Sequence, residues 1–225
     1  MSDIPWLTAD SLLFPDPERA LLEPNGLLAA GGDLTPERLI EAYKNGIFPW
    51  FEDDQPILWW SPDPRTILLP DKIRISRSLR KTVNKGLYKI TFDQAFDRVV
   101  EACSESRDGA ETGTWITAEM KSAYQQLFNM GLAHSVEAWH EGALVGGLYG
   151  VSSGKVFSGE SMFSRKSNAS KVALVHLCAH LDKSGYYLID CQVNSQHLKS
   201  LGAFEIPRKK YLTLLNQHQS FTPVW

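Results

Sequence analysis

The sequence predicts an α+β fold, and two features of the second half of the chain support this prediction. Three consecutive stretches alternate apolar and polar residues with the two-residue period of half-buried strands, at 134–140, 143–152 and 155–163. Short glycine-containing turns separate them, as in antiparallel hairpins. A largely apolar helix then ends at Gly185, and a mostly apolar strand follows at 186–193, as expected for a strand covered on both faces.

Shorter elements surround this predicted sheet. Helices are expected to begin after four residues whose side chains can cap a helix N-terminus: Thr35, Ser76, Asp93 and Thr117. Beyond the last strand, the pattern predicts a short helix at 195–201, a strand at 203–206 and a helix at 208–217. The first sixty residues are rich in Pro, Gly and Trp, and the segment 62–70 has the character of a connector. We therefore expect a small N-terminal domain at 1–64 and a larger domain at 65–225.

Composition and charge restrict the location and the partners. The 225 residues suffice for one domain and a smaller one, and the formal net charge is −3. No apolar run reaches membrane-spanning length, and the N-terminus lacks a basic region followed by an apolar one. The three cysteines cannot all pair and lie in apolar stretches, as reduced core cysteines do. The sequence therefore predicts a cytoplasmic protein with no membrane or DNA partner, in which an RNA contact needs a local basic patch.

Three polar residues stand in predicted strands. Asp190 and Gln192 interrupt the strand at 186–193, and a two-residue period places them on the same side. Glu160 lies in the strand at 155–163. A carboxylate in a buried strand is costly to desolvate unless it is paired, so Asp190 is either a satisfied structural anchor or a working group. If the two strands are neighbours in the sheet, all three side chains converge on one cleft.

An aromatic stretch, GIFPWFEDDQPILWWSPDPR at 46–65, allows two interpretations. Its large aromatic residues form either the core or the packing seam of the small domain, or a platform on which a nucleobase stacks. They are Phe48, Trp50, Phe51, Trp59 and Trp60. Trp115 lies at a loop end directly before a predicted helix and is expected to be exposed.

A cluster of cations follows the predicted connector. Arg77, Arg80, Lys81 and Lys85 crowd together on one short helix, and no acid lies near them after Asp71. Such a run is usually a solvated helix face. Here it is also the densest basic patch of an acidic protein, which makes it the candidate contact for RNA phosphates.

Several other chemistries lack support in the sequence. His176 and His180 lie four residues apart on a helix, but no third ligand has a typical spacing, so no metal site is expected. Cys191 should face away from Asp190, which argues against a cysteine nucleophile. The glycines of the strand at 143–152 lack the following helix of a dinucleotide site, and they indicate a bulge or a close approach of a ligand to the backbone.

The predicted order of helices and strands resembles the acetyltransferase-like fold called GNAT. Nine motifs in chain order also resemble one family, the leucyl/phenylalanyl-tRNA–protein transferases: GIFPW, WWSPDPR, ISRS, GTWIT, VGGLYG, GESMFS, NASK, LIDCQV and SLGA. The resemblance covers nearly the whole chain. It implies a small N-terminal domain and a GNAT-like C-terminal domain. It also implies transfer of Leu or Phe, and less readily Met, from aminoacyl-tRNA to an N-terminal Lys or Arg of an acceptor protein, which marks the product for the N-degron pathway of protein degradation.

Such a reaction requires no cofactor. An aminoacyl ester is already activated, so the enzyme has to supply a neutral amine, align it with the ester carbonyl and stabilise the tetrahedral oxyanion. A free α-amine has a pKa of about 8, so help from a hydrogen-bond acceptor suffices near neutral pH. We expect Gln192, held by Asp190, to accept the proton of the amine or to orient the amine. Glu160 or Asp190 is expected to face the basic acceptor side chain, and the sequence leaves open which acid has which role.

The resemblance also implies residues for substrate binding. Trp50 and Trp115 would hold the terminal adenosine of the tRNA, in line with the stacking interpretation. The cluster on the short basic helix would bind phosphates of the acceptor stem with little sequence readout. An apolar pocket for the amino-acid side chain would be formed by Leu148, Phe157, Met162, Leu174, Leu177 and Leu181. The family has Met at the position of Leu148 and Phe at those of Leu177 and Leu181, so the pocket stays apolar while its shape changes.

Two functions of other classes share these features. An acyl-CoA-dependent N-acetyltransferase uses the same fold, but SRKSNASK stands where a pyrophosphate-binding R/Q-x-x-G-x-G/A loop is needed. A non-catalytic tRNA-binding module would use the tryptophans and the basic helix, with no role for Asp190. The motifs favour the transferase.

Overall fold

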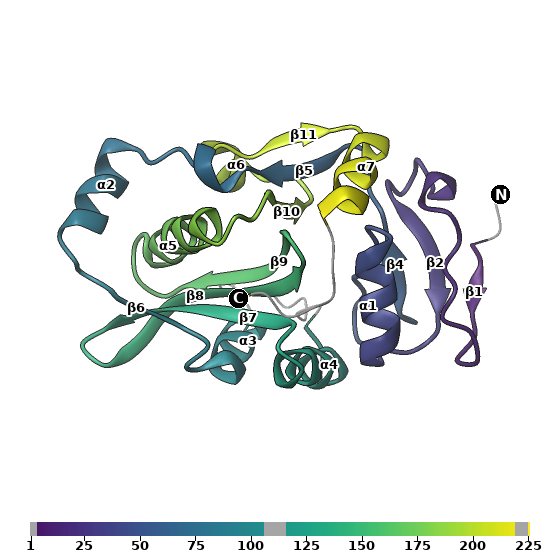
Figure 1. Cartoon of the computed structure of the whole chain (residues 1–225). Coiled ribbons are helices and arrows are strands. Elements are labelled where there is room, and N and C mark those ends of the chain that lie inside the picture. Colours follow the sequence, from purple (N-terminus) through teal and green to yellow (C-terminus); the bar gives the residue numbers. More distant parts are fainter. Residues whose placement is uncertain (1–3, 106–115, 219–224) are drawn as a thin grey trace.

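The computed structural model describes residues 4–105, 116–218 and 225, whose helices and strands form two β-sheets with helices packed on them (Figure 1). The smaller sheet comes from the N-terminal part of the chain and the larger sheet from the part that follows. This arrangement confirms the predicted α+β fold class. Within the described ranges, no helix has both the length and the apolar character that crossing a lipid bilayer requires.

The strands of the smaller sheet are short. They are β1 (Trp6–Leu7), β2 (Leu27–Gly31), β3 (Phe48–Pro49) and β4 (Leu58–Trp60). Their order is β1-β2-β4-β3, with β1 parallel to β2 and the other pairs antiparallel. The 3₁₀ helix η1 (Pro17–Arg19) and the helix α1 (Pro36–Lys44) connect them. As predicted, α1 has a proline in its first turn and ends before Gly46, whose φ of 69° favours glycine.

The larger sheet carries the strands that the sequence pattern predicts. They are β5 (Arg65–Leu68), β6 (Lys89–Phe92), β7 (Ala133–His140), β8 (Ala143–Ser153), β9 (Val156–Ser164), β10 (Leu188–Gln192) and β11 (Phe204–Ile206). Their order is β11-β5-β10-β9-β8-β7-β6, and β9 and β10 run in parallel. The prediction of three successive strands is confirmed to within one residue at each end. The expectation of a connector at 62–70 is wrong in part, because flanking prolines obscure the four-residue strand β5.

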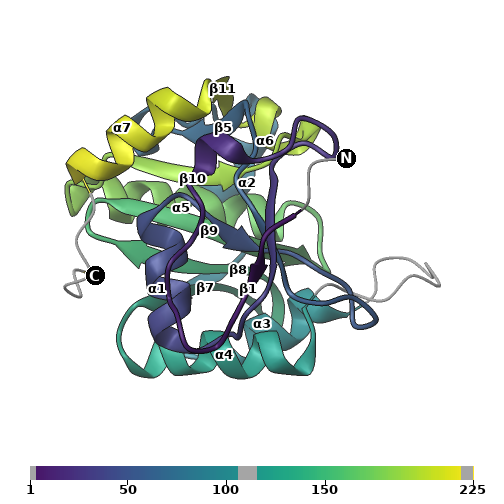
Figure 2. The ribbon, with the colours of Figure 1, turned by 90° about the vertical axis from the view of Figure 1, so that its right-hand side faces the viewer.

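Helices cover both faces of the larger sheet. They are η2 (Pro70–Lys72), α2 (Arg77–Asn84), α3 (Phe96–Ser104), α4 (Ala118–Asn129), α5 (Ala169–Lys183), α6 (Gln196–Ser200) and α7 (Arg208–His218). The helix α5 lies on one face, against β7 and β8, whereas α3 and α4 lie on the other (Figure 1). Figure 2, which looks at the molecule from the side of the smaller sheet, shows α1 between α7 and α4.

Of the four predicted helix caps, those at Ser76 and Thr117 are confirmed and the one at Asp93 is wrong. Thr35 is the N-cap residue of α1, but its side chain makes no capping hydrogen bond. The hydroxyls of Ser76 and Thr117 each accept a backbone N–H from the first turn of the helix that follows. Asp93, by contrast, does not cap α3, which begins after Ala95. Instead, Asp93 has a φ of 56° and accepts the backbone N–H of Ser135 at 2.7 Å, so it fixes the end of one strand to its neighbour.

Among the described residues, three clusters of buried apolar side chains lie against the larger sheet, and the smallest joins Val156 and Leu188 to Tyr211 and Leu215 of α7. The two larger clusters lie on opposite faces of the sheet. One joins the smaller sheet to α3 and α4 and includes Trp59 and Tyr124. The other lies beneath α5. Helix α5 approaches the sheet closely because Gly146 has no side chain, since a Cβ at that position would lie 2.5 Å from the Cβ of Ala169. These two packed layers fix β8, β9 and β10, which carry the candidate site.

Candidate active site

Glu160 is the extra residue of a β-bulge in β9. Opposite it on β8, Gly150 pairs with Gly159 and Tyr149 pairs with Ser161, so Glu160 has no partner in the ladder. A bulge of this kind redirects a side chain and is common next to active sites. The bulge that the glycines of this strand indicated is therefore confirmed at Gly150.

The neighbouring strand β10 is irregular at the same level. Its parallel pairing with β9 ends at Asp190, which lies opposite Ser158, and the two strands then separate. The register of β10 against β5 shifts between Asp190 and Gln192, and Gln192 has a φ of 61°. A residue with a side chain adopts this left-handed conformation at a cost of about 1–3 kcal/mol, which other contacts have to offset.

The structure brings Glu160, Asp190 and Gln192 together, as the sequence predicts for neighbouring strands. The side-chain amide of Gln192 donates a hydrogen bond to Oε1 of Glu160 at 2.9 Å. The backbone N–H of Gln192 donates to Oδ1 of Asp190, also at 2.9 Å. All three side chains are largely or fully buried. Cys191 packs against the cluster beneath α5 and so faces away from Asp190, as expected.

The carboxylate of Asp190 is fully engaged by buried partners. The guanidinium of Arg65 donates to its two oxygens, at 2.8 Å from Nε and 2.7 Å from Nη2. The hydroxyl of Tyr211 donates to the second oxygen at 2.8 Å. Arg65 also lies between the rings of Phe48 and Tyr211, 4.8 and 4.6 Å from their centroids. With both oxygens occupied, Asp190 acts on the site through the backbone of Gln192 that it holds.

Two tyrosine hydroxyls serve the other carboxylate. Tyr124 on α4 donates to Oε2 of Glu160 at 2.7 Å. Because the proton of Tyr124 is used in this way, its oxygen accepts from the hydroxyl of Tyr43 on α1, 2.8 Å away. Burial raises the pKa of Glu160 from 4.5 to about 7, although the hydrogen bonds from the tyrosines oppose the rise. Near neutral pH, Glu160 is therefore able to gain and lose a proton.

Sequence reasoning missed the four partners of these acids: Tyr43, Arg65, Tyr124 and Tyr211. A signal existed for Arg65, because it is a cation at the start of the apolar stretch TILL. The tyrosines gave no such signal, since an amphipathic helix buries tyrosine rings for their apolar area alone. Their hydroxyl partners lie on elements that are distant in sequence.

Some residues of the aromatic stretch belong to the core, whereas Trp50 is exposed, as a stacking platform requires. Phe48, Phe51 and Trp59 are buried, which confirms the core interpretation for these three residues. Trp50 is 46 % exposed, and its ring lies 5.5 Å from that of Trp60. The indole N–H of Trp60 donates to the carbonyl oxygen of Trp50 at 2.7 Å, which holds the exposed residue in place. The predicted partner Trp115 lies outside the described residues.

The six residues of the expected amino-acid pocket belong to one region. Leu148, Phe157, Leu174, Leu177 and Leu181 are members of the cluster beneath α5, and Met162 packs against it. Leu148 and Met162 face each other across β8 and β9. The half-buried Met162 lies two residues beyond Glu160 on β9, so the apolar cluster reaches the strand that carries the acid.

The basic cluster occupies a separate part of the surface. Arg77, Arg80, Lys81 and Lys85 are all exposed, and within the described residues none of them forms an ion pair. The helix α2 that carries the first three lies at the far end of the molecule from α1 and α7 (Figure 1). A ligand that contacts both this cluster and Glu160 therefore has to be long.

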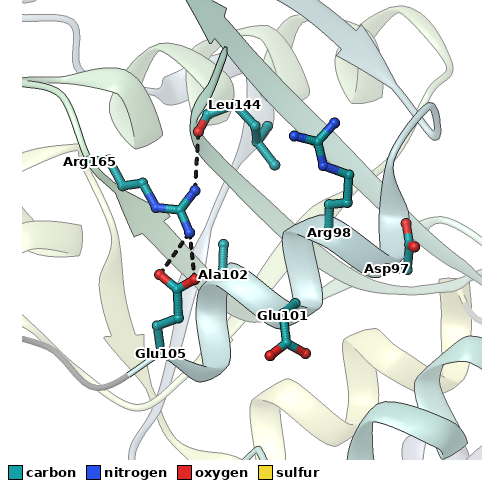
Figure 3. Close-up of a pocket in the computed structure, with 7 residues that line it drawn as sticks. All are labelled: Asp97, Arg98, Glu101, Ala102, Glu105, Leu144 and Arg165. Atoms are coloured by element: carbon teal, nitrogen blue, oxygen red, sulfur yellow. Dashed lines mark hydrogen bonds and ion pairs between the residues drawn. The ribbon is translucent and has the colours of Figure 1, made fainter.

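A cavity of about 360 Å³ lies beside α3, and Figure 3 shows the charged side chains that line it. Its lining shares no residue with the site around Glu160. Arg165 forms a two-pronged ion pair with Glu105, and Glu101 pairs with Lys121. Across the part of the chain that the structure describes, no group of three His, Cys, Asp or Glu side chains is arranged to hold a metal ion.

Comparison with known proteins identifies the family. A family model described as leucyl/phenylalanyl-tRNA protein transferase matches residues 67–216, and the model of its N-terminal domain matches 32–63. A leucyl/phenylalanyl-tRNA–protein transferase of Pseudomonas entomophila is 58% identical over 213 residues, which cover 95% of this chain and 94% of that protein. One of Nitrosospira multiformis is 58% identical over 214 residues, covering 95% and 91%.

A solved structure of L-PGS from Bacillus licheniformis is 12% identical to this chain, with a TM-score of 0.40 over 87% of this chain and 61% of that one. A score of this size does not define a shared fold. The two family models and the high identity over nearly the full length do define the relationship. The chain belongs to the leucyl/phenylalanyl-tRNA–protein transferase family.

Proposed function

We propose that this protein transfers leucine or phenylalanine, and less readily methionine, from aminoacyl-tRNA to the α-amine of an N-terminal Lys or Arg of an acceptor protein. The new peptide bond marks the acceptor for degradation, and the reaction takes place in the cytoplasm. Membership of the family supports the transfer itself. The observation that supports the site is the contact between Gln192 and Glu160, where β9 and β10 separate.

The chemical step needs an attacking amine without its extra proton. The nitrogen lone pair attacks the ester carbonyl, the bond between the carbonyl carbon and the ribose oxygen breaks, and the ribose oxygen takes up a proton. We assign Gln192 to orient the amine through its side-chain oxygen, because its amide nitrogen already donates to Glu160. Glu160 receives the proton that the amine loses, for which a pKa of about 7 is well suited.

The buried ion pair of Arg65 and Asp190 is explained by the need to hold Gln192 in position. Asp190 accepts the backbone N–H of Gln192, and Arg65 and Tyr211 hold Asp190. This arrangement supports the left-handed conformation of Gln192 and fixes its side chain against Glu160. Asp190 is thus a positioning residue, and its charge is neutralised by Arg65 before any substrate binds.

Separate surfaces receive the parts of the aminoacyl-tRNA. The exposed ring of Trp50 stacks on the terminal adenine, together with Trp115. The cluster of Arg77, Arg80, Lys81 and Lys85 binds phosphates of the acceptor stem, and its distance from the site suits a ligand as long as tRNA. The amino-acid side chain enters the apolar cluster beneath α5, beginning at Met162.

We also propose a division of the chain into a small domain at 1–64 and a GNAT-like domain at 65–225. The two separate sheets support it, since β5 begins the larger one at Arg65. The parallel pair β9 and β10, which diverges beyond Asp190, supports the likeness to GNAT enzymes.

The proposed function is tested with purified protein, tRNA charged with labelled leucine or phenylalanine, and short acceptor peptides. Label is expected in peptides that begin with Arg or Lys. Matched peptides with an acetylated N-terminal Arg should receive none, because they lack the attacking amine. An absence of transfer to every peptide, with the charged tRNA still intact, would refute the proposal. Equal transfer to peptides that begin with Ala would refute the assigned acceptor preference.

A further inference from the structure

Trp225 is surrounded by four other rings on the α5 side of the larger sheet. Its indole stacks on the imidazole of His134, with centroids 4.0 Å apart and 5° between the planes. His180 on α5 lies 4.8 Å from it, and Phe157 on β9 lies 5.8 Å away at 28°. Phe92 completes the group at 6.2 Å. The indole is therefore held between α5 and the strands β6, β7 and β9.

The contact with Phe157 connects Trp225 to the proposed amino-acid pocket. Phe157 is fully buried, and Trp225 packs against the same cluster as the other apolar residues beneath α5. Gly150 closes another side of the Phe157 ring, because a Cβ at Gly150 would lie 2.6 Å from that ring. Phe157 is thus confined by the sheet and by the indole of Trp225. The indole is therefore one of the contacts that hold the Phe157 ring.

We infer that Trp225 is a specificity-determining residue of the transfer reaction, and this inference rests on the proposed function. By filling the space beyond Phe157, the indole sets the depth of the apolar pocket. Without it, Phe157 gains room to move away from the bound side chain and the pocket becomes deeper. A deeper pocket favours phenylalanine over leucine, since a pocket excludes a larger side chain by steric contact but scarcely excludes a smaller one.

The experiment compares Trp225→Ala with a matched control, Trp139→Ala. Trp139 lies on β7, packs against the other apolar cluster and donates to Thr91 at 2.7 Å. Transfer is measured as kcat/KM for phenylalanyl-tRNA and leucyl-tRNA. Binding of non-reactive aminoacyl-adenosine amides that carry either side chain is measured by calorimetry. We expect Trp225→Ala to raise the preference for phenylalanine roughly tenfold in both measurements, free indole to reverse the change, and Trp139→Ala to leave the preference unaltered.

The outcomes separate this inference from the proposed function. A folded Trp225→Ala protein with the wild-type preference would overturn the inference and leave the function intact. Binding of both amides by wild-type protein without any transfer would refute the function, and the binding preference would still decide the role of Trp225. If the alanine variant does not fold, Trp225→Phe and Trp225→Leu take its place. Wild-type preferences in both, or no amide binding by the wild-type protein, would count against the inference.

Discussion

The contribution of Glu160 to the free energy of unfolding depends on pH, because burial favours the neutral form of its side chain. Its pKa is raised from 4.5 to about 7 in the folded protein, and burial is the largest cause. A raised pKa contributes stability that is present below pH 4.5 and is lost as the pH rises through 7. The unfolding free energy should therefore fall by an amount on the order of 3 kcal/mol across this window. Denaturant titrations at several pH values should show this fall in the wild-type protein and a flatter curve for Glu160→Gln.

The hydroxyl of Tyr124 should set the pH at which the enzyme becomes active. It stabilises the charged form of Glu160, so Tyr124→Phe should raise the pKa of that acid above its present value of about 7. The rising limb of kcat/KM for the acceptor peptide then moves to higher pH. Tyr88→Phe is a suitable control, because this substitution also removes one hydroxyl hydrogen bond, from Tyr88 to the carbonyl oxygen of Ser167, and this bond does not involve Glu160. If the rising limb of the pH profile stayed in place in both variants, the hydroxyl of Tyr124 would not control the pKa of Glu160.

The pair of Arg65 and Asp190 offers a test of positioning against stability. Asp190→Ala leaves the buried guanidinium without a counter-charge and removes the acceptor of the Gln192 N–H, which should cost about 3–5 kcal/mol of stability. Transfer should fall roughly 10²-fold, because Gln192 loses its alignment, while tRNA binding in a filter assay stays at the wild-type level. The double variant Arg65→Met with Asp190→Leu should regain stability without regaining activity. Recovery of full activity in the double variant would show that the contact between Asp190 and the backbone of Gln192 is not needed for transfer.

Single residues were predictable where a polar group breaks an apolar pattern. Glu160, Asp190 and Gln192 stand out for this reason, and the structure brings them together. What the pattern could not supply was the state of each carboxylate. Asp190 and Glu160 look equivalent in sequence, yet one is neutralised by Arg65 and the other is held by tyrosine hydroxyls from distant helices. Such partners come from tertiary packing, to which local periodicity is blind.

At the scale of elements, long periodic segments were the most predictable. The strands β7, β8 and β9 and the helix α5 follow directly from alternation and apolar spacing. The strand β5 has only four residues and lies between Pro64 and Pro70, so it is too short for a period to show. The bulge at Glu160 was indicated by glycines, but the residue that it displaces depends on the pairing of β8 with β9. Asp93 resembled a helix cap, and a neighbouring strand captured its side chain instead.

The helix α2 gives an element-scale prediction about tRNA. Its cations are exposed, so they should contribute to affinity mainly by releasing counterions from phosphates. The double variant Arg80→Ala with Lys81→Ala should bind tRNA more weakly and reduce the slope of log affinity against log salt by about one per residue removed. Lys210→Ala, an exposed cation on α7 at the other end of the molecule, serves as the control. An unchanged slope in the α2 variant would show that tRNA binds elsewhere.

At the scale of the whole molecule, the two sheets are separate but their side chains share one core. The cluster on the α3 and α4 side contains residues of the smaller sheet as well as residues of the larger one. Polar contacts also cross between them, such as Tyr43 with Tyr124 and the guanidinium of Arg65 with the carbonyl oxygen of Gly46, at 3.1 Å. The proposed division at residue 65 therefore separates the two sheets, but the side chains on either side of it pack into one core.

This shared core predicts cooperative unfolding. Far-ultraviolet circular dichroism, which follows the helices and strands, and tryptophan fluorescence, to which Trp50, Trp59 and Trp60 of the aromatic stretch contribute, should give the same thermal midpoint. Two well-separated midpoints would show that the smaller sheet unfolds as a unit of its own. In that case the hydrogen bond between Tyr43 and Tyr124 would be lost when the smaller sheet unfolds.

The spread of the site along the chain has a consequence for its synthesis. The side chains that hold Glu160 and Asp190 begin at Tyr43 and extend to Tyr211 on α7. A ribosome releases residues in order, so the elements up to β10 emerge before the last partner of Asp190 exists. In a nascent chain, Glu160 and Asp190 are therefore present before all their hydrogen-bond partners have been made. The site is complete only once α7 has left the exit tunnel.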